Sequence, residues 1–413
     1  MTEPRVVLQE EHGNIAELVR KFGINYLPQP PNNDITKIWV FGLRPDGYLS
    51  YYIGLDWLDE GKIALRVSSK IEGADHHAML NECLKSPVAS RYLGEAYDIR
   101  ADHPFIVSAN DDAEILPLLV IHFLVLLEDL LRKPLKKGYV FREENLQSKM
   151  KGKVLLNIHM TKNVFGMRPD RVMCRYQEYS TDCQENRLIH SAYTISSKYL
   201  VSWGETTRRY YLDSMRFASL ENYFGGIGFI ERDSELKSIK SNPVYREYGE
   251  VLRLARLIYR IRGYREKHGE RDIYSVPPYI IDMSKLFELY VYALLYNAVG
   301  KDIDYQVHGK GGGIVDFLDT TRKLVVDAKY KPIYETSFDM DNMRQVAGYA
   351  RNTALLDKLG VENRDQVVDC LIIYPQTGAN DLTSDHYKYG REAIKEYNKI
   401  FKLGIAVPSR VEA

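Results

Sequence analysis

The chain has 413 residues, of which 45% are hydrophobic and 27% charged, which is typical of a globular protein with two or three domains. Lys plus Arg and Asp plus Glu both number 56, which excludes a basic field over the whole surface. Any contact with DNA must therefore use a local patch or a partner chain. The four cysteines lack CxxC spacing, which argues against a zinc site or a disulfide framework and favours a reducing compartment: Cys83, Cys174, Cys183 and Cys370.

Residues 1–135 are predicted to be rich in β-structure. Three apolar runs, KIWVFGL, YLSYYIGLDWL and IALRVSSKI, are separated by the turn sequences RPDG and DEGK, which predicts a small barrel-like or curled sheet. The N-terminus lacks a signal-peptide core, and the longest apolar run, Ile115 to Leu127, has 13 residues and is too short to span a bilayer. We expect this run to form a buried helix in a cytoplasmic protein without a membrane segment.

Residues 136–270 are predicted to form a middle region of mixed helices and strands. A polar turn opens a helix that carries Asn186 and Arg187, and composition favours a solvent-facing helix start for this pair. Apolar residues with helical spacing predict a second helix from Pro243 to about Arg262. Three arginines share another face of that helix and form either a solvated surface or a stripe that follows phosphates: Arg253, Arg256 and Arg260.

The sequence GGGIVDFLDTTRKLVVDAKYK predicts two short strands joined by a polar turn. A turn centred between Thr321 and Arg322 places Asp316 opposite Asp327. Side chains two apart on a strand share a face, so Lys329 points the same way as Asp327. Two carboxylates suit Mg²⁺, and a lysine beside them can orient water or offset charge on a phosphate. Such charges also occur as solvated residues on surface strands.

Predicted helices flank these two strands. The helix predicted upstream, from Met283 to Asn297, carries Glu288 in a mostly apolar and aromatic run, either as a site residue or as a surface carboxylate. The helix predicted downstream, from Asp339 to Arg351, places Gln345 and Tyr349 on one face. This order of helix, strand, Asp-x-Lys strand and helix resembles the core of the PD-(D/E)xK nucleases.

The end of the chain completes the predicted C-terminal domain. Residues 367–376, VVDCLIIYPQ, are predicted to form a buried strand, and a final helix is expected near residues 385–400. The whole chain is therefore predicted to be an α+β multidomain protein, with an α/β nuclease core of the PD-(D/E)xK kind in residues 271–413.

Several segments, in the same order, also resemble the McrC family, the nuclease subunit of the McrBC type of restriction system. The resemblance covers about residues 140–380. It rests on ENLQSKMKGKV, YSTDCQENRLIHSAY, MSKLFELYVYALL, IVDF, LVVDAKYK and LIIYP. The first 135 residues match the family less closely.

This resemblance implies a Mg²⁺-dependent endonuclease subunit that cuts modified, methylated double-stranded DNA. It implies docking on McrB, a hexameric AAA+ GTPase, with residues 1–135 as the region that binds this partner and stimulates GTP hydrolysis. GTP is then bound by the partner, because HGKGGG lacks the Ser or Thr of a phosphate-binding loop.

The expected nuclease site contains five side chains and one backbone group. Metal ligands are Asp316, Asp327 and the carbonyl of Ala328, and Lys329 acts on the attacking water or the phosphate. Glu288 and Gln345 are further catalytic candidates. Two other functions remain open, a non-catalytic adaptor that activates the GTPase and a stand-alone nuclease for branched or damaged DNA.

Overall fold

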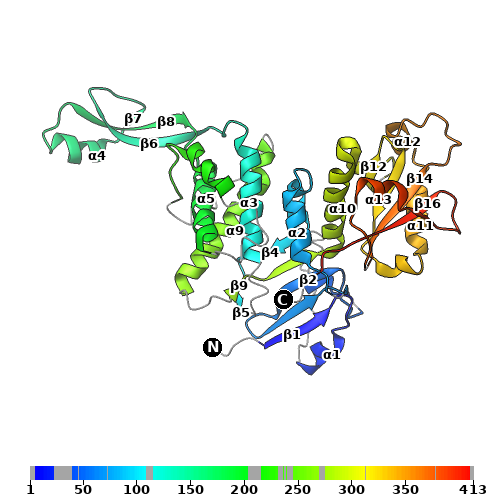
Figure 1. The fold of residues 1–413 in the computed structure, drawn as a ribbon. Helices are drawn as coiled ribbons and strands as arrows, with labels where there is room; N and C mark the ends of the chain where they lie inside the picture. The colour runs from blue at the N-terminus through cyan, green and yellow to red at the C-terminus, as the bar shows by residue number, and fades with distance from the viewer. Residues whose placement is uncertain are drawn as a thin grey trace. The chain divides into compact units, whose positions relative to one another are not determined.

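The structure is a computed structural model in which the chain forms two compact units (Figure 1). One unit contains Met1–Leu118 and His268–Ala413, and the other contains Leu119–Lys267. Both mix helices with strands, in agreement with the predicted α+β class. None of the described helices is long and apolar enough to cross a membrane. The structure describes residues 5–22, 40–44, 46–71, 73–107, 115–202, 215–230, 236, 239, 245–268, 275–311, 313–376 and 378–409.

The first unit contains an open five-stranded sheet of order β1-β3-β2-β10-β4. Only β1 and β3 run parallel. The edge strands β1 and β4 do not pair with each other, so the barrel-like closure predicted for this region is wrong for the described strands. The strands are β1 (Arg5–Glu10), β2 (Tyr52–Asp59), β3 (Ile63–Ser68), β4 (Tyr97–Ile99) and β10 (Tyr279–Asp282).

The sequence pattern predicted only local pairing, whereas β10, which follows β2 by more than 200 residues, lies between β2 and β4. Gly54 makes this approach possible, because its φ is +131° and an added Cβ would collide with the carbonyl oxygen of Tyr279. The predicted strands YLSYYIGLDWL and IALRVSSKI are confirmed as β2 and β3. Of KIWVFGL, residues 37–39 lie outside the described residues, and Val40–Gly42 forms a short 3₁₀ turn.

Helices and short elements complete the first unit, and one apolar core lies against the five-stranded sheet. The core includes Ile15, Phe41, Leu65 and Ile280, all fully buried. Asp75 caps α2 by accepting a 3.0 Å hydrogen bond from the amide of Ala78. The further elements are α1 (Ala16–Lys21), α2 (His76–Lys85), the paired β5 (Ile106–Val107) and β9 (Ser275–Val276), and 3₁₀ turns at Ala89–Arg91, Leu93–Glu95, Gly300–Asp302 and Pro332–Glu335.

The same unit contains a six-stranded mixed sheet of order β11-β12-β13-β14-β16-β15. Strands β11, β12 and β13 are antiparallel neighbours, whereas β13, β14 and β16 run parallel. The strand containing VVDA is therefore an inner strand, as its apolar sequence predicted. The strands are β11 (Ile303–His308), β12 (Ile314–Asp319), β13 (Leu324–Ala328), β14 (Asp369–Pro375), β15 (Glu392–Ala393) and β16 (Ile400–Ile405).

The predicted helices beside this sheet are confirmed as α10 and α11. Asp282 caps α10 through the amide of Lys285, and Asp339 caps α11. The final helix predicted near residues 385–400 is wrong beyond Tyr389, because β15 and β16 follow and β16 pairs with β14. The helices are α10 (Met283–Val299), α11 (Met340–Tyr349), α12 (Thr353–Lys358) and α13 (Ser384–Tyr389).

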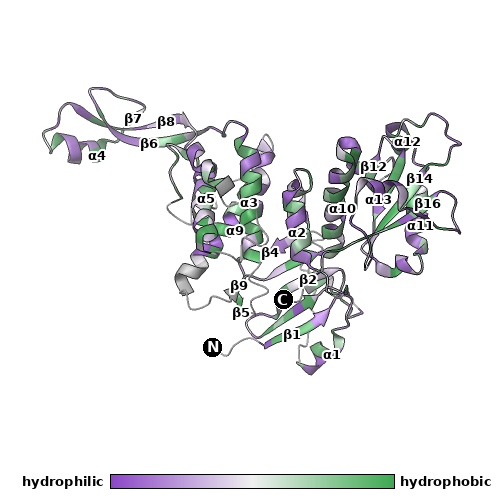
Figure 2. Ribbon diagram, in the orientation of Figure 1, coloured by the Kyte–Doolittle hydropathy of each residue, from purple (hydrophilic) through white to green (hydrophobic). Residues whose placement is uncertain are grey.

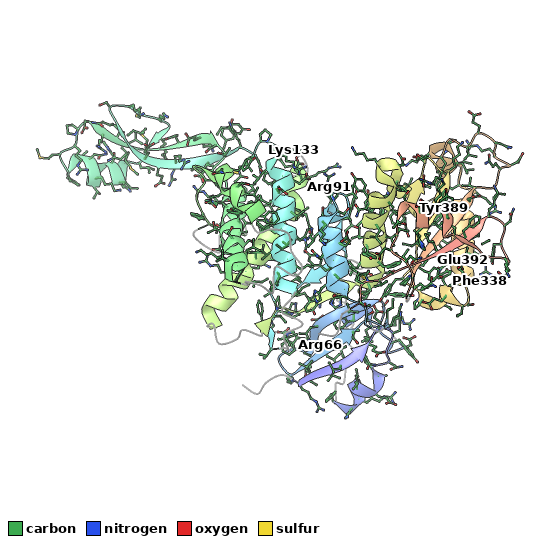
Figure 3. All side chains as sticks on the ribbon, viewed as in Figure 1. Arg66, Arg91, Lys133, Phe338, Tyr389 and Glu392 are labelled. Carbon is green, nitrogen blue, oxygen red and sulfur yellow. The ribbon has the colours of Figure 1, made fainter. Side chains whose placement is uncertain are left out.

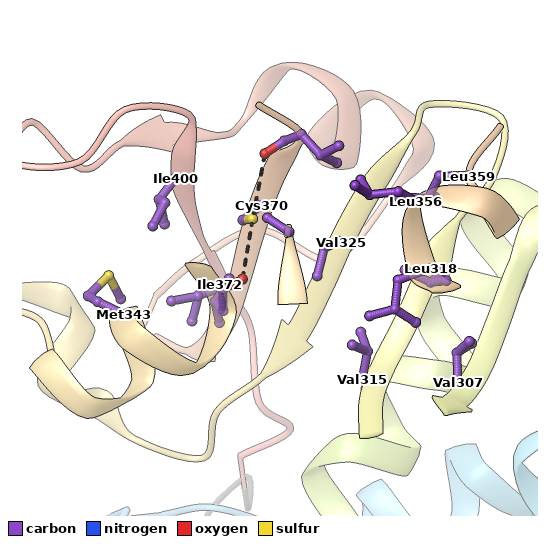
Figure 4. Packing of buried hydrophobic residues seen from close by; sticks show 14 of the residues in the cluster. Val307, Val315, Leu318, Val325, Met343, Leu356, Leu359, Cys370, Ile372 and Ile400 are labelled. Atoms are coloured by element: carbon purple, nitrogen blue, oxygen red, sulfur yellow. Dashed lines mark hydrogen bonds between the residues drawn. The ribbon is translucent and has the colours of Figure 1, made fainter. Parts of the chain in front are cut away.

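One apolar core joins α11 and α12 to the six-stranded sheet (Figure 4). Val325 of β13 and Cys370 of β14 belong to it together with Met343 and Val346 of α11. Burying such side chains contributes about 1.5–3 kcal/mol each, which fixes the strands that carry the acidic residues. All four cysteines of the chain are free and buried.

The second unit is built on long helices. The predicted buried helix is confirmed as α3, which Figure 2 shows as predominantly hydrophobic. The helix predicted from Pro243 to about Arg262 is confirmed as α9 from Glu247 onward, and Pro243 lies outside the described residues. The elements are α3 (Ile115–Leu131, of which residues 119–131 belong here), α5 (Gln184–Ser202), α7 (Met215–Ala218), a 3₁₀ turn at Ser219–Phe224, and α9 (Glu247–His268).

A long hairpin projects from these helices, and we call residues 138–180 the arm (Figure 1). Its strands β6 and β8 pair along their entire ten-residue length, from Gly138 opposite Ser180 to Gln147 opposite Arg171. The distal part contains the remaining short elements. The elements are β6 (Gly138–Gln147), β7 (Lys153–Val154), α4 (Leu156–His159), a π-helical turn (Met160–Val164) and β8 (Arg171–Ser180).

Candidate active site

The carboxylates of Asp316 and Asp327 meet on the adjacent strands β12 and β13. Phe317 pairs with Val326, which is the register that a turn centred between Thr321 and Arg322 gives, so this predicted pairing is confirmed. Asp316 is half-buried, whereas Asp327 is only 1% exposed. Oδ2 of Asp316 accepts a 2.8 Å hydrogen bond from the amide of Ala328, which ties the first strand to the end of the second.

Lys329 completes the group as sequence reasoning expected. Its ammonium nitrogen lies 2.8 Å from Oδ2 of Asp327. Its backbone amide donates a 2.9 Å hydrogen bond to the carbonyl of Ile373 on β14. Because the inner strand β14 fixes this backbone, the lysine side chain starts from a rigid position.

Burial is the main cause of the shifted pKa values of these two carboxyl groups. Burial raises the pKa of the Asp316 carboxyl well above its usual range, and the charges of Asp327 and Glu288 raise it further. Burial also raises the pKa of Asp327, although Lys329 opposes this effect. Burial alone would lower the pKa of the Lys329 ammonium, but the charges of Asp327 and Asp316 raise it above its usual value.

Glu288 lies near this pair and has partners of its own. Its Oε1 accepts hydrogen bonds from the hydroxyl of Tyr305 at 2.8 Å, from Nε2 of Gln306 at 3.1 Å and from the ammonium of Lys285 at 3.2 Å. Its charge contributes to the raised pKa values of both aspartates, which places it in electrostatic reach of them.

Gln345 and Tyr349 form an exposed edge on α11. Nε2 of Gln345 donates a 2.7 Å hydrogen bond to the hydroxyl of Tyr349. The ring of Tyr349 packs against the start of β12, since a Cβ added to Gly313 would lie 3.0 Å from its Cε1. The charges of Asp327 and Asp316 raise the pKa of Tyr349, after a larger effect of burial. The predicted i, i+4 pair is therefore confirmed, next to the two carboxylates.

The donor set fits a hard divalent cation such as Mg²⁺. Oδ2 of Asp327 is buried, and the ammonium of Lys329 lies 2.8 Å from it. Two adjacent carboxylates whose ionised forms are disfavoured would be stabilised by a cation between them. The described residues contain no group of three or more His, Cys, Asp and Glu side chains that could hold a metal. Mg²⁺ commonly keeps several waters and needs only one or two carboxylates.

Sequence reasoning missed Tyr305 and Gln306, which hold Glu288 from β11. Gln306 has a φ of +48°, a left-handed conformation that is uncommon and strained for residues other than glycine. It faces β12 at the position of Asp316, between the pairs Tyr305–Phe317 and Val307–Val315. The only local signal was polar residues within a short strand, which does not reveal a strained backbone.

A second cluster of charged side chains, centred on Asp182, lies where the arm joins α5, near the Asn186–Arg187 pair. Arg187 binds both carboxylate oxygens of Asp182 at 2.7 Å, and Arg142 of β6 lies 3.1 Å from the same carboxylate. Asn186 is fully buried and donates to the carbonyls of Lys136 and Thr181. The interpretation as a solvent-facing helix start is therefore wrong for Asn186.

The arginines of α9 have partners within the same unit. Arg253 binds Glu250, and Arg256 donates to the carbonyl of Ile239. Both side chains are half-buried, so neither a fully solvated face nor a free phosphate-following stripe describes them. Only Arg260 of the three is exposed.

Residues 49–352 match the family described as McrBC 5-methylcytosine restriction system component. The chain belongs to this McrBC family. No curated protein sequence matches the chain.

Two solved structures of McrBC proteins were compared with the chain. A refined half-complex from a tetradecameric assembly of Thermococcus gammatolerans McrB AAA+ hexamers with bound McrC has a chain with 14% identity and a TM-score of 0.39. The match covers 97% of this chain and 94% of that one. The cryo-EM structure of the Thermococcus gammatolerans McrBC complex gives 14% identity and a TM-score of 0.30, over 70% and 87% of the two chains. Neither value shows a shared fold.

Proposed function

We propose that this McrBC-family chain is a Mg²⁺-dependent endodeoxyribonuclease with a PD-(D/E)xK core, which cuts modified DNA in complex with an AAA+ GTPase. The observation that carries the proposal is the convergence of Asp316, Asp327 and Lys329 on adjoining inner strands. Two carboxylates can hold a metal ion that polarises a phosphate and activates water, and an ammonium can offset the charge that develops.

Each residue has a defined task in this proposal. Asp316, Asp327 and the carbonyl of Ala328 would hold Mg²⁺, which supplies polarisation of the phosphate and a lowered pKa for a bound water. The ammonium of Lys329 holds the attacking water or offsets the charge that develops on the phosphate oxygens. Glu288, which accepts a hydrogen bond from Tyr305, would be a further carboxylate that orients water or metal ligands near Asp316 and Asp327.

Gln345 acts at the edge of the site, where its amide and the hydroxyl of Tyr349 are exposed enough to contact a DNA backbone. Such phosphate contacts position a duplex without reading its sequence. The equal numbers of acidic and basic residues agree with this arrangement, because most of the grip on DNA would then be supplied by other chains.

The proposed partner is a McrB-like hexameric AAA+ GTPase, which binds and hydrolyses the GTP. Family membership supports this partner, and the arm offers a surface for it. Large apolar side chains are exposed along the arm, including Phe165 at 75% and Met167 at 87%. Residues 148–171 carry six basic residues against one acidic residue, so the far end of the arm is basic as well as apolar. Side chains project from it on several sides (Figure 3).

An exposed surface of this kind is uncommon on a protein without a partner. The proposed contact is therefore with an apolar and acidic surface of the GTPase. We place this contact on the arm in residues 138–180, and the partner-binding role that the family resemblance implies for residues 1–135 stays a prediction.

The test combines the purified full chain with a McrB-like GTPase, GTP, Mg²⁺ and a methylated duplex. We expect cleavage that EDTA stops and that Asp327→Ala abolishes, with folding and stimulation of the GTPase unchanged. A matched control is Asp304→Ala, which removes an exposed carboxylate from β11. Cleavage by Asp327→Ala would contradict the site assignment.

The arm also supports a second function, because it can bind a partner whether or not the chain cuts DNA. A non-catalytic adaptor would stimulate the GTPase while the wild type leaves the duplex intact. A stand-alone nuclease would cut without the GTPase. The same assay therefore separates the three functions.

A further inference from the structure

We propose that Lys70 and Tyr330 are positioning residues, which hold the backbone next to Lys329 and thereby make the five-stranded sheet part of the nuclease site. This inference rests on the proposed function. Both residues belong to the same compact unit, although 260 positions separate them in the sequence.

The backbone after Lys329 makes a tight turn. The amide of Lys331 donates a 2.7 Å hydrogen bond to the carbonyl of Lys329. Tyr330, at the centre of this turn, is only 2% exposed, and its ring centroid lies 5.8 Å from that of Phe287 on α10. Because Lys329 and Tyr330 are consecutive and share this turn, holding Tyr330 restricts the backbone from which the Lys329 side chain starts.

Two consecutive residues that follow β3 hold Tyr330 at three points. The ammonium of Lys70 donates a 3.1 Å hydrogen bond to the carbonyl of Tyr330 and lies 4.5 Å from the centre of its ring. The hydroxyls of Ser69 and Tyr330 lie 2.8 Å apart. These contacts restrict both the backbone and the side chain of Tyr330. They are a charge-assisted hydrogen bond, a cation–π contact and a hydrogen bond between two hydroxyls.

The five-stranded sheet in turn holds Lys70. Its backbone amide donates a 3.3 Å hydrogen bond to Oε2 of the buried Glu11, which directly follows β1. Its ammonium also lies 4.6 Å from the ring centre of Tyr51, which precedes β2. Lys70 therefore connects the sheet to the end of β13, and we call Glu11, Ser69, Lys70 and Tyr330 the clasp.

The functional consequence follows from the geometry of Lys329. Its ammonium lies 2.8 Å from Asp327, so a backbone displacement of about 1 Å would break the alignment of the lysine with the carboxylates, and such displacements can cost about 10²-fold in rate. The clasp touches neither carboxylate in the described structure. Its loss should therefore lower kcat and leave DNA binding unchanged.

The experiment measures DNA cleavage and backbone amide exchange on the full chain. Lys70→Met removes the ammonium but keeps most of the side-chain length, and Tyr330→Phe removes only the hydroxyl contact. We expect Lys70→Met to lower kcat roughly 10- to 100-fold with KM unchanged, and Tyr330→Phe to lower it less. Lys70→Arg should recover part of the rate, because a guanidinium can still donate to the same carbonyl and place a cation beside the same rings.

Amide hydrogen exchange measures the rigidity of the backbone after Lys329 independently of DNA cleavage. In Lys70→Met the amide of Lys331 should exchange faster than in the wild type, whereas amides of β16 should not change. Lys62→Met is the matched control, because Lys62 is an exposed lysine at the turn between β2 and β3, with a side chain that is 75% exposed. It should alter neither kcat nor exchange.

The outcomes separate this inference from the proposed function. If the wild type cuts DNA and Lys70→Met cuts at the same rate, the positioning role is wrong while the nuclease proposal stands. Unchanged exchange at Lys331 in Lys70→Met would also overturn it. If the wild type does not cut at all, both the proposed nuclease function and the positioning role that depends on it are wrong.

Discussion

Aspartates in two clusters of this protein have carboxyl pKa values that are shifted in opposite directions. At the root of the arm, Asp182 receives two hydrogen bonds from Arg187, one from the amide of Gly228 and an ion pair from Arg142. The hydrogen bonds from Arg187 are the main cause of a lowered pKa for its carboxyl. In the candidate active site, burial raises the pKa values of Asp316 and Asp327.

The difference shows which cluster serves structure and which is available for chemistry. Asp182 has all its charge balanced by neighbours, so it stabilises the root of the arm. The pair Asp316 and Asp327 has one ammonium for two carboxylates, so it can gain from a cation that the chain itself does not supply.

The largest expected effect comes from the ammonium of the active site. Lys329→Met should lower cleavage by roughly 10²–10³-fold, because it removes a preorganised positive group beside the phosphate. Binding of Mg²⁺ should persist, since both carboxylates remain. Lys323→Met is the control, because Lys323 is exposed and contacts the carbonyl of Gly360. Cleavage by Lys329→Met at the rate of the wild type would remove this residue from the mechanism.

The next effect is on stability at the root of the arm. Asp182→Ala should lower the free energy of unfolding by about 1–3 kcal/mol, because it removes charge-assisted hydrogen bonds from two half-exposed arginines. Urea denaturation followed by circular dichroism measures this loss. A change below about 0.5 kcal/mol, as for ordinary surface residues, would show that the cluster does not hold the arm.

The pKa of Asp182 also predicts an acid dependence. The folded-state pKa is lowered, so its contribution is present above the ordinary aspartate value of about 3.9 and is lost as the pH falls through the lower folded value. The stability difference between the wild type and Asp182→Ala should therefore shrink in acid below about pH 4. A difference that stays constant down to pH 2 would contradict this account.

A smaller effect of opposite sign is expected at Asp316. Its folded-state pKa is raised, so this group favours the folded state below about pH 4, and that advantage is lost as the pH rises through the raised value. Asp316→Asn keeps an acceptor for the amide of Ala328 and removes the charge. At neutral pH without metal it should raise the free energy of unfolding by about 1 kcal/mol while abolishing cleavage.

The check is thermal unfolding of both proteins in EDTA at several pH values. The gain for Asp316→Asn should be largest at neutral pH and should vanish near pH 3. A destabilised variant at neutral pH would show that the carboxylate pair is not under electrostatic strain.

The smallest effect is expected at the edge of the site. Tyr349→Phe removes the acceptor of the 2.7 Å hydrogen bond from Gln345. Because this bond is exposed, stability should change by less than about 0.5 kcal/mol. Cleavage should fall by roughly 2- to 10-fold through a raised KM, since a lost neutral hydrogen bond costs about 0.5–1.5 kcal/mol. Steady-state kinetics separate KM from kcat, and a change in kcat alone would contradict the edge role.

The sequence was sufficient to predict the part of the site that is local in the chain. A short polar turn fixed the register of Asp316 and Asp327, and strand alternation placed Lys329 on their face. The apolar spacing of α10 and α11 likewise predicted the two helices beside them.

What could not be predicted depends on contacts between distant residues. The insertion of β10 beside β2 requires the close approach at Gly54, and the contact of Lys70 with Tyr330 joins residues far apart in the chain. The final helix expected near residues 385–400 ends at Tyr389, because the chain continues into β15 and β16 and β14 offers β16 a parallel partner. Tertiary pairing overrides a local preference of this kind.

The most direct test of the central claim is calorimetric titration of the full chain with Mg²⁺. We predict one site whose affinity rises with pH, because the raised carboxyl pKa values make protons compete with the metal. Asp316→Asn and Asp327→Asn should each abolish this binding. Equal binding by the wild type and both variants, or none by the wild type, would contradict the account.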